Sequence, residues 1–362
     1  MPRDEEGRFD DLLSVDELER LVASGGLRHP AFRVVKAGEK IVLGDYTEDV
    51  SWRPQPFTGT AQVERVVAAF SRGATIVLQA LHVNHPPLAH FCRELERNLG
   101  HPVQANAYYT PRAAQGLPVH HDTHDVLCLQ LSGEKRWLVY PPALELPLRN
   151  QKYGPELGDP AEPVLDVTLR GGDTLYLPRG WLHKALTSET DSLHLTIGVN
   201  VYTWLEAFKA ALQEAAAEEV DLRRGVAADG TAPDGIVDQV AARLTPDAVT
   251  RRMREKLIRT RRPIRDDFFD QLRVLDQLEL ETLLVRRETV LADLAAEGGQ
   301  VTLVYEGREI AFPAKVCSEL GFIAASDEPF RLSDLPGNLD DESRLVLGRR
   351  LVREGFLRIS LP

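Results

Sequence analysis

The sequence predicts an α+β protein in which a double-stranded β-helix (a jelly roll) is followed by a helical region and a small winged-helix domain. Three patterns predict this order. Short apolar segments between turn residues fill 75–201, an Ala/Glu-rich amphipathic stretch covers 204–220, and a hairpin pattern lies at 301–312. A chain of 362 residues exceeds one ordinary domain core. We therefore predict three regions, residues 1–203, 204–262 and 263–362.

The residues before the jelly roll are predicted to form helices and short strands. Ser14-Val-Asp-Glu17 has the capping-box pattern that begins a helix. Residues 31–60 carry β-forming side chains broken by glycine and proline, and helical spacing returns in 61–70 and 87–99. Gly100 is placed to end the last of these helices.

Eight strands are predicted for the jelly roll, which is of the cupin kind. Turn signals separate them, notably Ser132-Gly133, Gly171-Gly172-Asp173 and Pro178-Arg179-Gly180. The predicted strands are 75–78, 105–110, 126–131, 135–140, 163–169, 174–177, 184–186 and 192–199.

After Tyr202 the strand pattern gives way to helices. Residues 204–220 and 236–260 are predicted to be helical, with a Gly/Asp/Pro linker at 225–235 and a break at Thr245-Pro246. Because helical pairs between two domains often dimerise, we expect a homodimer.

The last region has a core of its own. The hairpin at 301–312 is followed by an amphipathic helix at 341–354 and a final strand at 356–361, which suggests a winged helix. Acidic residues outnumber basic ones, 55 to 43, giving a net charge of −12. This balance argues against direct nucleic-acid binding and favours a structural or docking role for the region.

Composition also indicates the compartment. There is no apolar run of 18 residues, and the acidic N-terminus does not have the pattern of a signal peptide. Three widely spaced cysteines predict no disulfide framework. We expect a soluble cytoplasmic protein without a membrane span.

Two motifs carry the predicted chemistry, Pro118-Val-His-His-Asp-Thr-His-Asp125 and Pro178-Arg-Gly-Trp-Leu-His183. On a strand through 120–124, His120 and Asp122 would share the inner face and His121 would point outward. His183 follows a tight Pro-Gly turn and would supply the third ligand from a facing strand. Two imidazoles and one carboxylate form a facial triad that leaves half of an octahedral metal open for oxygen chemistry.

Other metal sites fit the sequence less well. Manganese and zinc cupins commonly have His-x-His followed by Glu, and this sequence has neither His-x-His nor a Glu between His120 and Ser132. Zinc hydrolases more often use three histidines, or two and a glutamate. A non-haem iron oxygenase is the prediction that remains.

Four segments together resemble the ribosomal oxygenases, JmjC-type 2-oxoglutarate-dependent protein hydroxylases also grouped as cupin-4 proteins. These segments are 106–111, 115–122, 129–137 and 172–183, and Ser192-Leu-His194-Leu-Thr196 continues the match. The resemblance covers roughly 75–200 at the level of motifs. The layout of the family (jelly roll, helical dimerisation region, winged helix) matches that predicted for the whole chain.

The resemblance implies Fe(II) held by His120, Asp122 and His183, with 2-oxoglutarate chelating the iron. The far carboxylate of 2-oxoglutarate would meet Lys135, with Thr196 adding a hydroxyl. Arg136 would face outward, although arginine serves this purpose in the bacterial arginine hydroxylases.

Asn106 and Tyr108 occupy positions that line the family's substrate channel. The sequence departs from the histidine hydroxylases at Val77, where they carry a polar side chain, and at Gly198, where they carry serine. The implied reaction is hydroxylation of a protein side chain, histidine or arginine first, in a ribosomal protein. The hydroxylated residue and the co-purifying metal stay open. An oxygenase of a small molecule or peptide natural product is the first alternative, followed by a non-catalytic scaffold and by lysine demethylation.

Overall fold

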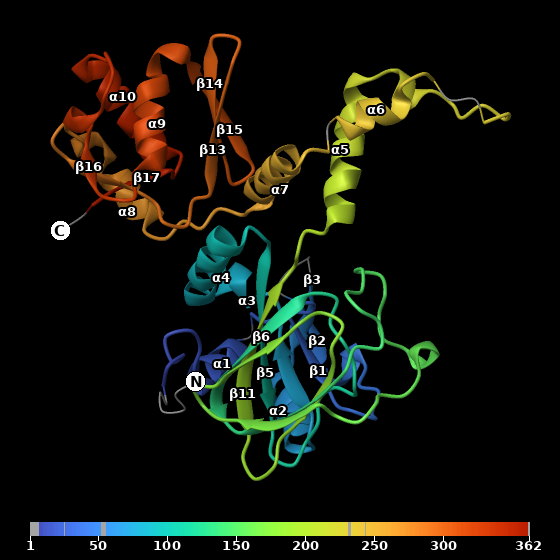
Figure 1. Cartoon of the computed structure of the whole chain (residues 1–362). Helices are drawn as coiled ribbons and strands as arrows, with labels where there is room; N and C mark the ends of the chain where they lie inside the picture. Colours follow the sequence, from blue (N-terminus) through green and yellow to red (C-terminus); the bar gives the residue numbers. More distant parts are fainter. Residues whose placement is uncertain (1–6, 25, 52–55, 231–232, 243, 361–362) are drawn as a thin grey trace. The chain divides into compact units, whose positions relative to one another are not determined.

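The computed structural model describes residues 7–24, 26–51, 56–230, 233–242 and 244–360. The chain divides into two compact units, residues 1–201 and 202–362 (Figure 1). It is a mixed α and β protein, as predicted. Among the described residues, no helix is long and apolar enough to cross a membrane.

Helices precede the main strands of the first unit. Helix α1 (Val15–Ala23) begins where the capping pattern predicts, with Ser14 Oγ accepting from Glu17 N at 3.2 Å. Helix α4 (Pro86–Leu99) ends at Gly100, which has a left-handed φ of 70°. The other early elements are α2 (Val63–Ser71), α3 (Leu81–Asn84) and the paired strands β2 (Thr47–Ser51) and β3 (Pro56–Ala61).

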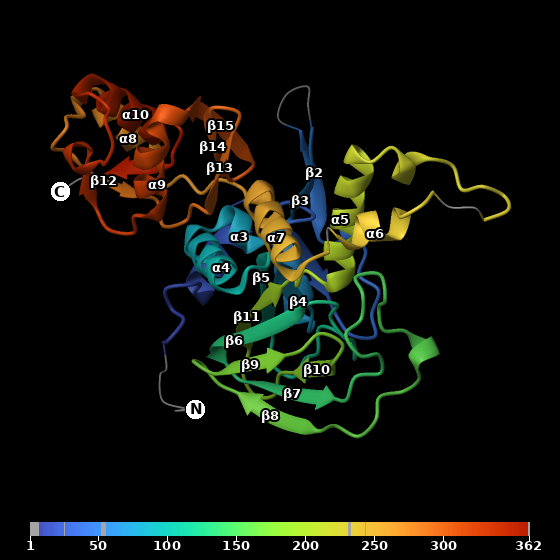
Figure 2. The same ribbon diagram turned by 45° about the horizontal axis from the view of Figure 1, so that its top comes forward.

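Two antiparallel sheets form the body of the first unit. The larger has the order β1 (Phe32–Val35), β4 (Thr75–Leu78), β5 (Val103–Thr110), β11 (Ser192–Val199), β6 (Asp125–Gly133) and β9 (Thr174–Leu177). The smaller has the order β10 (Leu182–Leu186), β7 (Lys135–Tyr140) and β8 (Leu165–Leu169), and Figure 2 shows these three strands side by side. Each of the eight predicted strands is present, and β1 is an addition that pairs with β4.

Side chains on β11 alternate between two environments, which decides what faces the site. Leu193, Leu195 and Ile197 are fully buried in the core that also contains helix residues such as Leu18 and Leu88. The intervening His194, Thr196 and Gly198 face the other way. There they meet a second core, built from both sheets by side chains such as Val126, Trp137 and Leu177.

The second unit begins with helices. Helix α5 (Trp204–Glu218) starts in a capping box, in which Glu206 N donates to Thr203 Oγ1 at 3.2 Å and Thr203 N donates to Glu206 Oε2 at 3.0 Å. The predicted break at Thr245-Pro246 separates α6 (Ile236–Ala241) from α7 (Pro246–Thr260).

The rest of the second unit has two three-stranded sheets. One has the order β13 (Ala292–Glu297), β14 (Gln300–Tyr305) and β15 (Arg308–Pro313), so the predicted hairpin has a third strand. The other has the order β16 (Phe330–Arg331), β12 (Leu283–Arg286) and β17 (Leu357–Ile359). In sequence, helix α8 (Phe268–Val274) precedes both sheets, α9 (Cys317–Ala325) lies between β15 and β16, and α10 (Asp341–Arg353) lies between β16 and β17. Short 3₁₀ turns occur at Leu43–Asp45, Pro155–Leu157, Asp221–Arg223, Leu275–Gln277, Ala314–Val316 and Leu332–Asp334.

Candidate metal centre

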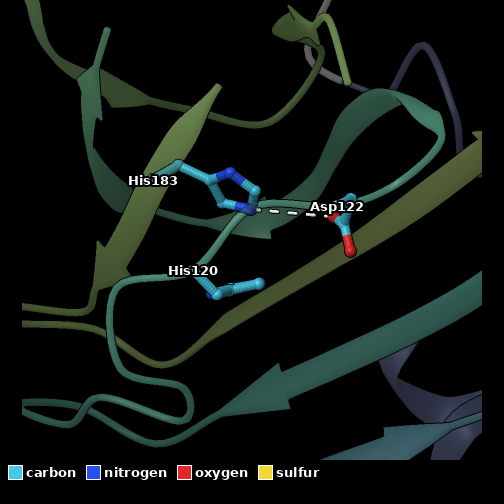
Figure 3. A group of neighbouring side chains, drawn as sticks. All are labelled: His120, Asp122 and His183. Atoms are coloured by element: carbon cyan, nitrogen blue, oxygen red, sulfur yellow. Dashed lines mark ion pairs between the residues drawn. The ribbon is translucent and has the colours of Figure 1, made fainter. Parts of the chain in front are cut away.

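His120, Asp122 and His183 lie together in the first unit, with one potential ligand atom from each within 4.8 Å of the others. Figure 3 shows the three side chains pointing toward one another, with His183 coming from β10. His183 Nε2 lies 3.7 Å from Asp122 Oδ2, and the two imidazole ring centres are 4.4 Å apart. Two imidazole nitrogens and one carboxylate therefore converge on a single point.

The backbone holds the two histidines side by side. His120 N donates to His183 O at 3.1 Å, and His183 N donates to His120 O at 2.8 Å. This pair of bonds is an isolated bridge, and β6 begins only at Asp125. The expectation of a strand through 120–124 was therefore wrong. The carbonyl of Asp122 accepts instead from Gly180 N at 3.0 Å, so a turn rather than strand alternation places its carboxylate.

His121 lies outside the group of three candidate ligands. It is 6% exposed, and its Nε2 lies 2.9 Å from Gln151 O. His121 thus attaches the long β7–β8 connection to the segment that carries two of the candidate ligands.

Each candidate histidine ligand has its other ring nitrogen occupied by a carbonyl. Nδ1 of His120 donates to Pro118 O at 2.8 Å, and Nδ1 of His183 donates to Trp181 O at 3.0 Å. With the proton on Nδ1, Nε2 keeps the lone pair that a metal needs. Burial, followed by the nearby His120, lowers the pKa of His183 to about 4. The ring is therefore neutral at physiological pH, as metal binding requires.

These three side chains open onto a cavity with about 490 Å³ of space free of atoms. Apolar side chains such as Val126 and Trp137 form part of its wall. Among the described residues, five polar side chains reach it besides the candidate ligands: Thr75, Tyr108, Lys135, His194 and Thr196.

Lys135 crosses the interior from the smaller sheet to the larger one. It is 3% exposed, and its Nζ donates to Thr110 Oγ1 on β5 at 2.8 Å. Within the described part of the chain, no carboxylate forms an ion pair with it. Burial lowers the pKa of Lys135 to about 7. Arg136 faces outward as predicted and binds Asp166 on the exposed surface.

Of the other predicted site residues, Tyr108 and Thr196 reach the cavity and Asn106 does not. Tyr108 is buried, and this burial raises the pKa of its hydroxyl. Thr196 lies opposite Asn106 in the strand register. Asn106 Oδ1 accepts from Ala80 N at 2.9 Å, and Asn106 is absent from the described residues that line the cavity.

At Val77 and Gly198 the sequence departs from the histidine hydroxylases, and the neighbouring residues leave little space at either position. Val77 is fully buried. A Cβ on Gly198 would lie 3.1 Å from Gln104 Cγ and from His124 Cε1. Gln104 Nε2 donates to His124 Nε2 at 3.1 Å, so this pair fills the space beside Gly198.

Sequence reasoning gave no role to His194, Gln104 or His124. The positions of His194 and Gln104 in the sequence could have identified these two residues. His194 is two residues before Thr196 and Gln104 two before Asn106, so strand alternation places each on the face of its predicted neighbour.

Comparison with known proteins defines the class. Residues 78–207 match the JmjC domain family. Ribosomal oxygenase 1 of Gallus gallus is 30% identical over 253 residues, which are 67% of this chain and 41% of that protein. The bifunctional lysine-specific demethylase and histidyl-hydroxylase NO66 of Drosophila persimilis is 29% identical over 231 residues, 62% of this chain and 32% of that protein. This chain therefore spans less than half the length of either relative.

Among solved structures, Escherichia coli ribosomal oxygenase YcfD matches 96% of this chain and 91% of its own, with a TM-score of 0.55 and 18% identity. This likeness shows a shared fold. Residues 78–207 thus form a JmjC domain. Within that class, the resemblance to the ribosomal oxygenases that the motifs predicted is confirmed.

Proposed function

We propose that this chain is an Fe(II)- and 2-oxoglutarate-dependent oxygenase that hydroxylates an amino-acid side chain of a protein. One observation carries the proposal: a His-Asp-His cluster and a buried lysine without a carboxylate partner among the described residues line the same cavity. The cluster suits a metal with open positions, and the lysine suits an anionic co-substrate. The YcfD fold has been solved with cobalt and 2-oxoglutarate bound, which supports this pairing.

The donor set fits Fe(II). His120 and His183 offer Nε2 atoms whose rings are oriented through Nδ1, and Asp122 offers a carboxylate oxygen. When bound, iron and 2-oxoglutarate supply dioxygen activation coupled to oxidative decarboxylation of the keto acid to succinate.

The chain's own contribution is placement. Lys135 and Thr196 hold the co-substrate, and Trp137 keeps one wall of the cavity apolar and dry. We propose that Tyr108, which lines the cavity, and Asn106, outside the described lining on the same face of β5, position the substrate side chain.

The first test is anaerobic Fe(II) loading followed by measurement of succinate. We expect wild type to form succinate and His120→Ala, Asp122→Ala and His183→Ala to form none while keeping their circular-dichroism spectra. Substantial turnover by any of the three would remove that residue from the metal centre. If wild type binds iron but forms no succinate, the non-catalytic scaffold becomes the better account.

The substrate we propose is a ribosomal protein, with histidine or arginine as the target residue. The names of the relatives, ribosomal oxygenase and histidyl-hydroxylase, support a protein substrate. We expect a ribosomal protein fraction to stimulate succinate formation and to gain one oxygen atom on a single peptide by mass spectrometry. Succinate without stimulation would redirect the search to a small molecule or peptide natural product, and loss of a methyl group would indicate demethylation.

We further propose that residues 204–262 form a homodimer interface and that residues 263–362 are a winged-helix domain used for docking. Helix α5 leaves Trp204, Leu205, Phe208 and Leu212 between 42% and 61% exposed, which supports a missing partner surface. Light scattering should report a dimer for wild type and a monomer for Phe208→Asp. Val346→Asp, at a comparably exposed site on α10, is the matched control and should stay dimeric. A reducing cytoplasm is the proposed compartment, supported by three free cysteines.

A further inference from the structure

His194 lies deep inside the first unit and lines the same cavity as Lys135. It comes from β11 of the larger sheet and is 3% exposed. Its ring stacks on Tyr108 with centres 5.0 Å apart and meets Trp137 edge-on at 5.4 Å. The two aromatic contacts fix the plane of the imidazole, so its nitrogens have defined directions.

One ring nitrogen of His194 is buried without a hydrogen-bond partner in the described protein. Among the described residues, the buried Nδ1 of His194 has no hydrogen-bond partner. Most buried polar atoms in folded proteins are hydrogen-bonded, because desolvation without a partner is costly. A histidine retained only for packing would be expected to satisfy both nitrogens within the protein. A ligand bound in the cavity would supply a hydrogen-bond partner for Nδ1 of His194.

The cation beside it identifies the chemistry of that partner. The positive charge of Lys135 acts on His194, and among the described residues the Lys135 ammonium donates to the hydroxyl of Thr110. Burial and the nearby lysine charge hold the pKa of His194 well below its usual value, so the ring is neutral. A neutral imidazole has one N–H donor. An ammonium and an imidazole N–H that line one cavity can bind the two oxygens of one carboxylate.

We propose that His194 is a positioning residue for the dicarboxylate co-substrate, donating its ring N–H to one oxygen of the far carboxylate while Lys135 binds the other. This inference rests on the proposed function, since it concerns the same co-substrate. It adds a third group to the site for which only Lys135 and Thr196 were expected, and it gives the stacked Tyr108–His194 pair a role in fixing the bound ligand.

Calorimetric binding of 2-oxoglutarate to the cobalt-loaded full chain tests the proposal without turnover. His194→Phe keeps the aromatic packing and removes both nitrogens. We expect it to bind 2-oxoglutarate at least about tenfold more weakly than wild type, the loss typical of a hydrogen bond to a charged group. 2-Oxobutanoate, which keeps the chelating end and lacks the far carboxylate, is the matched ligand and should lose little affinity.

The outcomes separate this inference from the proposed function. Equal binding of 2-oxoglutarate by wild type and His194→Phe overturns the role of His194 and leaves the oxygenase standing. Equal weakening of both ligands assigns His194 to packing and also overturns it. If cobalt-loaded wild type binds neither ligand, the proposed function itself fails, and the inference fails with it.

Two further variants keep the test decisive if His194→Phe does not fold, as read by circular dichroism and cobalt uptake. His194→Asn places an amide N–H near the position of Nδ1, and His194→Gln places one near Nε2. A preference of about tenfold for one of them in 2-oxoglutarate binding supports the proposal and identifies the donating nitrogen. Equal affinities for 2-oxoglutarate in these two variants overturn it.

Discussion

Lys135, inside the jelly roll, combines charge and burial in a way that suits an anionic ligand. Other buried cations of the described chain lie beside a carboxylate, as Arg93 lies beside Glu96 and Arg287 beside Asp267. Lys135 has a hydroxyl alone, and burial lowers its pKa to about 7. The groups facing it are also uncharged, since burial raises the pKa of the Cys128 thiol and lowers that of His194. Without an anionic ligand, the buried ammonium of Lys135 therefore destabilises the folded protein.

Replacing Lys135 by methionine should stabilise the empty protein and abolish 2-oxoglutarate binding. We expect a gain of about 1–4 kcal/mol in the free energy of unfolding at pH 7, because a buried charge is replaced by an apolar side chain of similar length. Urea unfolding of the metal-free protein measures this gain. Arg136→Met, at the exposed neighbour that binds Asp166, is the control and should change stability by less than about 1 kcal/mol.

The pH dependence has a definite sign. Between the folded pKa of about 7 and the ordinary lysine pKa of 10.5, the unfolded chain binds a proton at Lys135 that the folded chain does not. The free energy of unfolding of wild type should therefore rise with pH across this window, and the rise should be smaller in Lys135→Met. Identical pH profiles for the two proteins would contradict a buried, unpaired ammonium.

At the level of elements, the contact between α4 and β5 sets the position of the strand that carries Asn106 and Tyr108. Glu96 Oε2 accepts from Arg93 Nε at 3.1 Å, and its Oε1 accepts from Val103 N at 2.9 Å, at the first residue of β5. One buried carboxylate therefore joins a helix to the edge of the site.

Glu96→Ala should destabilise the first unit by about 3–5 kcal/mol, because it leaves the buried Arg93 without this carboxylate. Glu94→Ala, on the exposed face of the same helix, should change stability by less than about 0.5 kcal/mol. Thermal unfolding of both variants gives the comparison. A loss below about 1 kcal/mol in Glu96→Ala would mean that the α4–β5 connection does not depend on this carboxylate.

Elements also mark where sequence patterns succeed and fail. The strands between Thr75 and Val199 could be predicted because turn residues bound them and β-forming side chains fill them. Residues 121–124 could not, because their backbone groups bond to a turn and a loop that are distant in sequence, at Gly180 and Gln151. Alternation is valid only inside a ladder, and within residues 120–124 the structure has a ladder contact at His120 alone, in its bridge to His183.

For the whole molecule, the grouping of His120, Asp122 and His183 could be predicted because the residue types themselves specify a metal. The floor of the cavity could not be predicted in the same way. Lys135 meets Thr110, and His194 meets Trp137, across two sheets whose facing positions no local pattern encodes. The sequence predicted a boundary between the jelly roll and the helices at 203–204. The structure divides into two compact units at 201–202.

The division into two units predicts which backbone amides ligand binding will protect from hydrogen exchange. 2-Oxoglutarate at about 100 times its dissociation constant should stabilise the folded, cobalt-loaded protein by about 2.7 kcal/mol, because it binds only that state. Every residue proposed to hold the metal or 2-oxoglutarate lies in the first unit, on β5, β7, β10 and β11 and in the segment before β6. Amide hydrogen exchange should therefore slow in these elements and stay unchanged in β13, β14 and β15 of the second unit. Asp122→Ala should show no slowing anywhere, and equal protection of both units in wild type would contradict a site confined to the jelly roll.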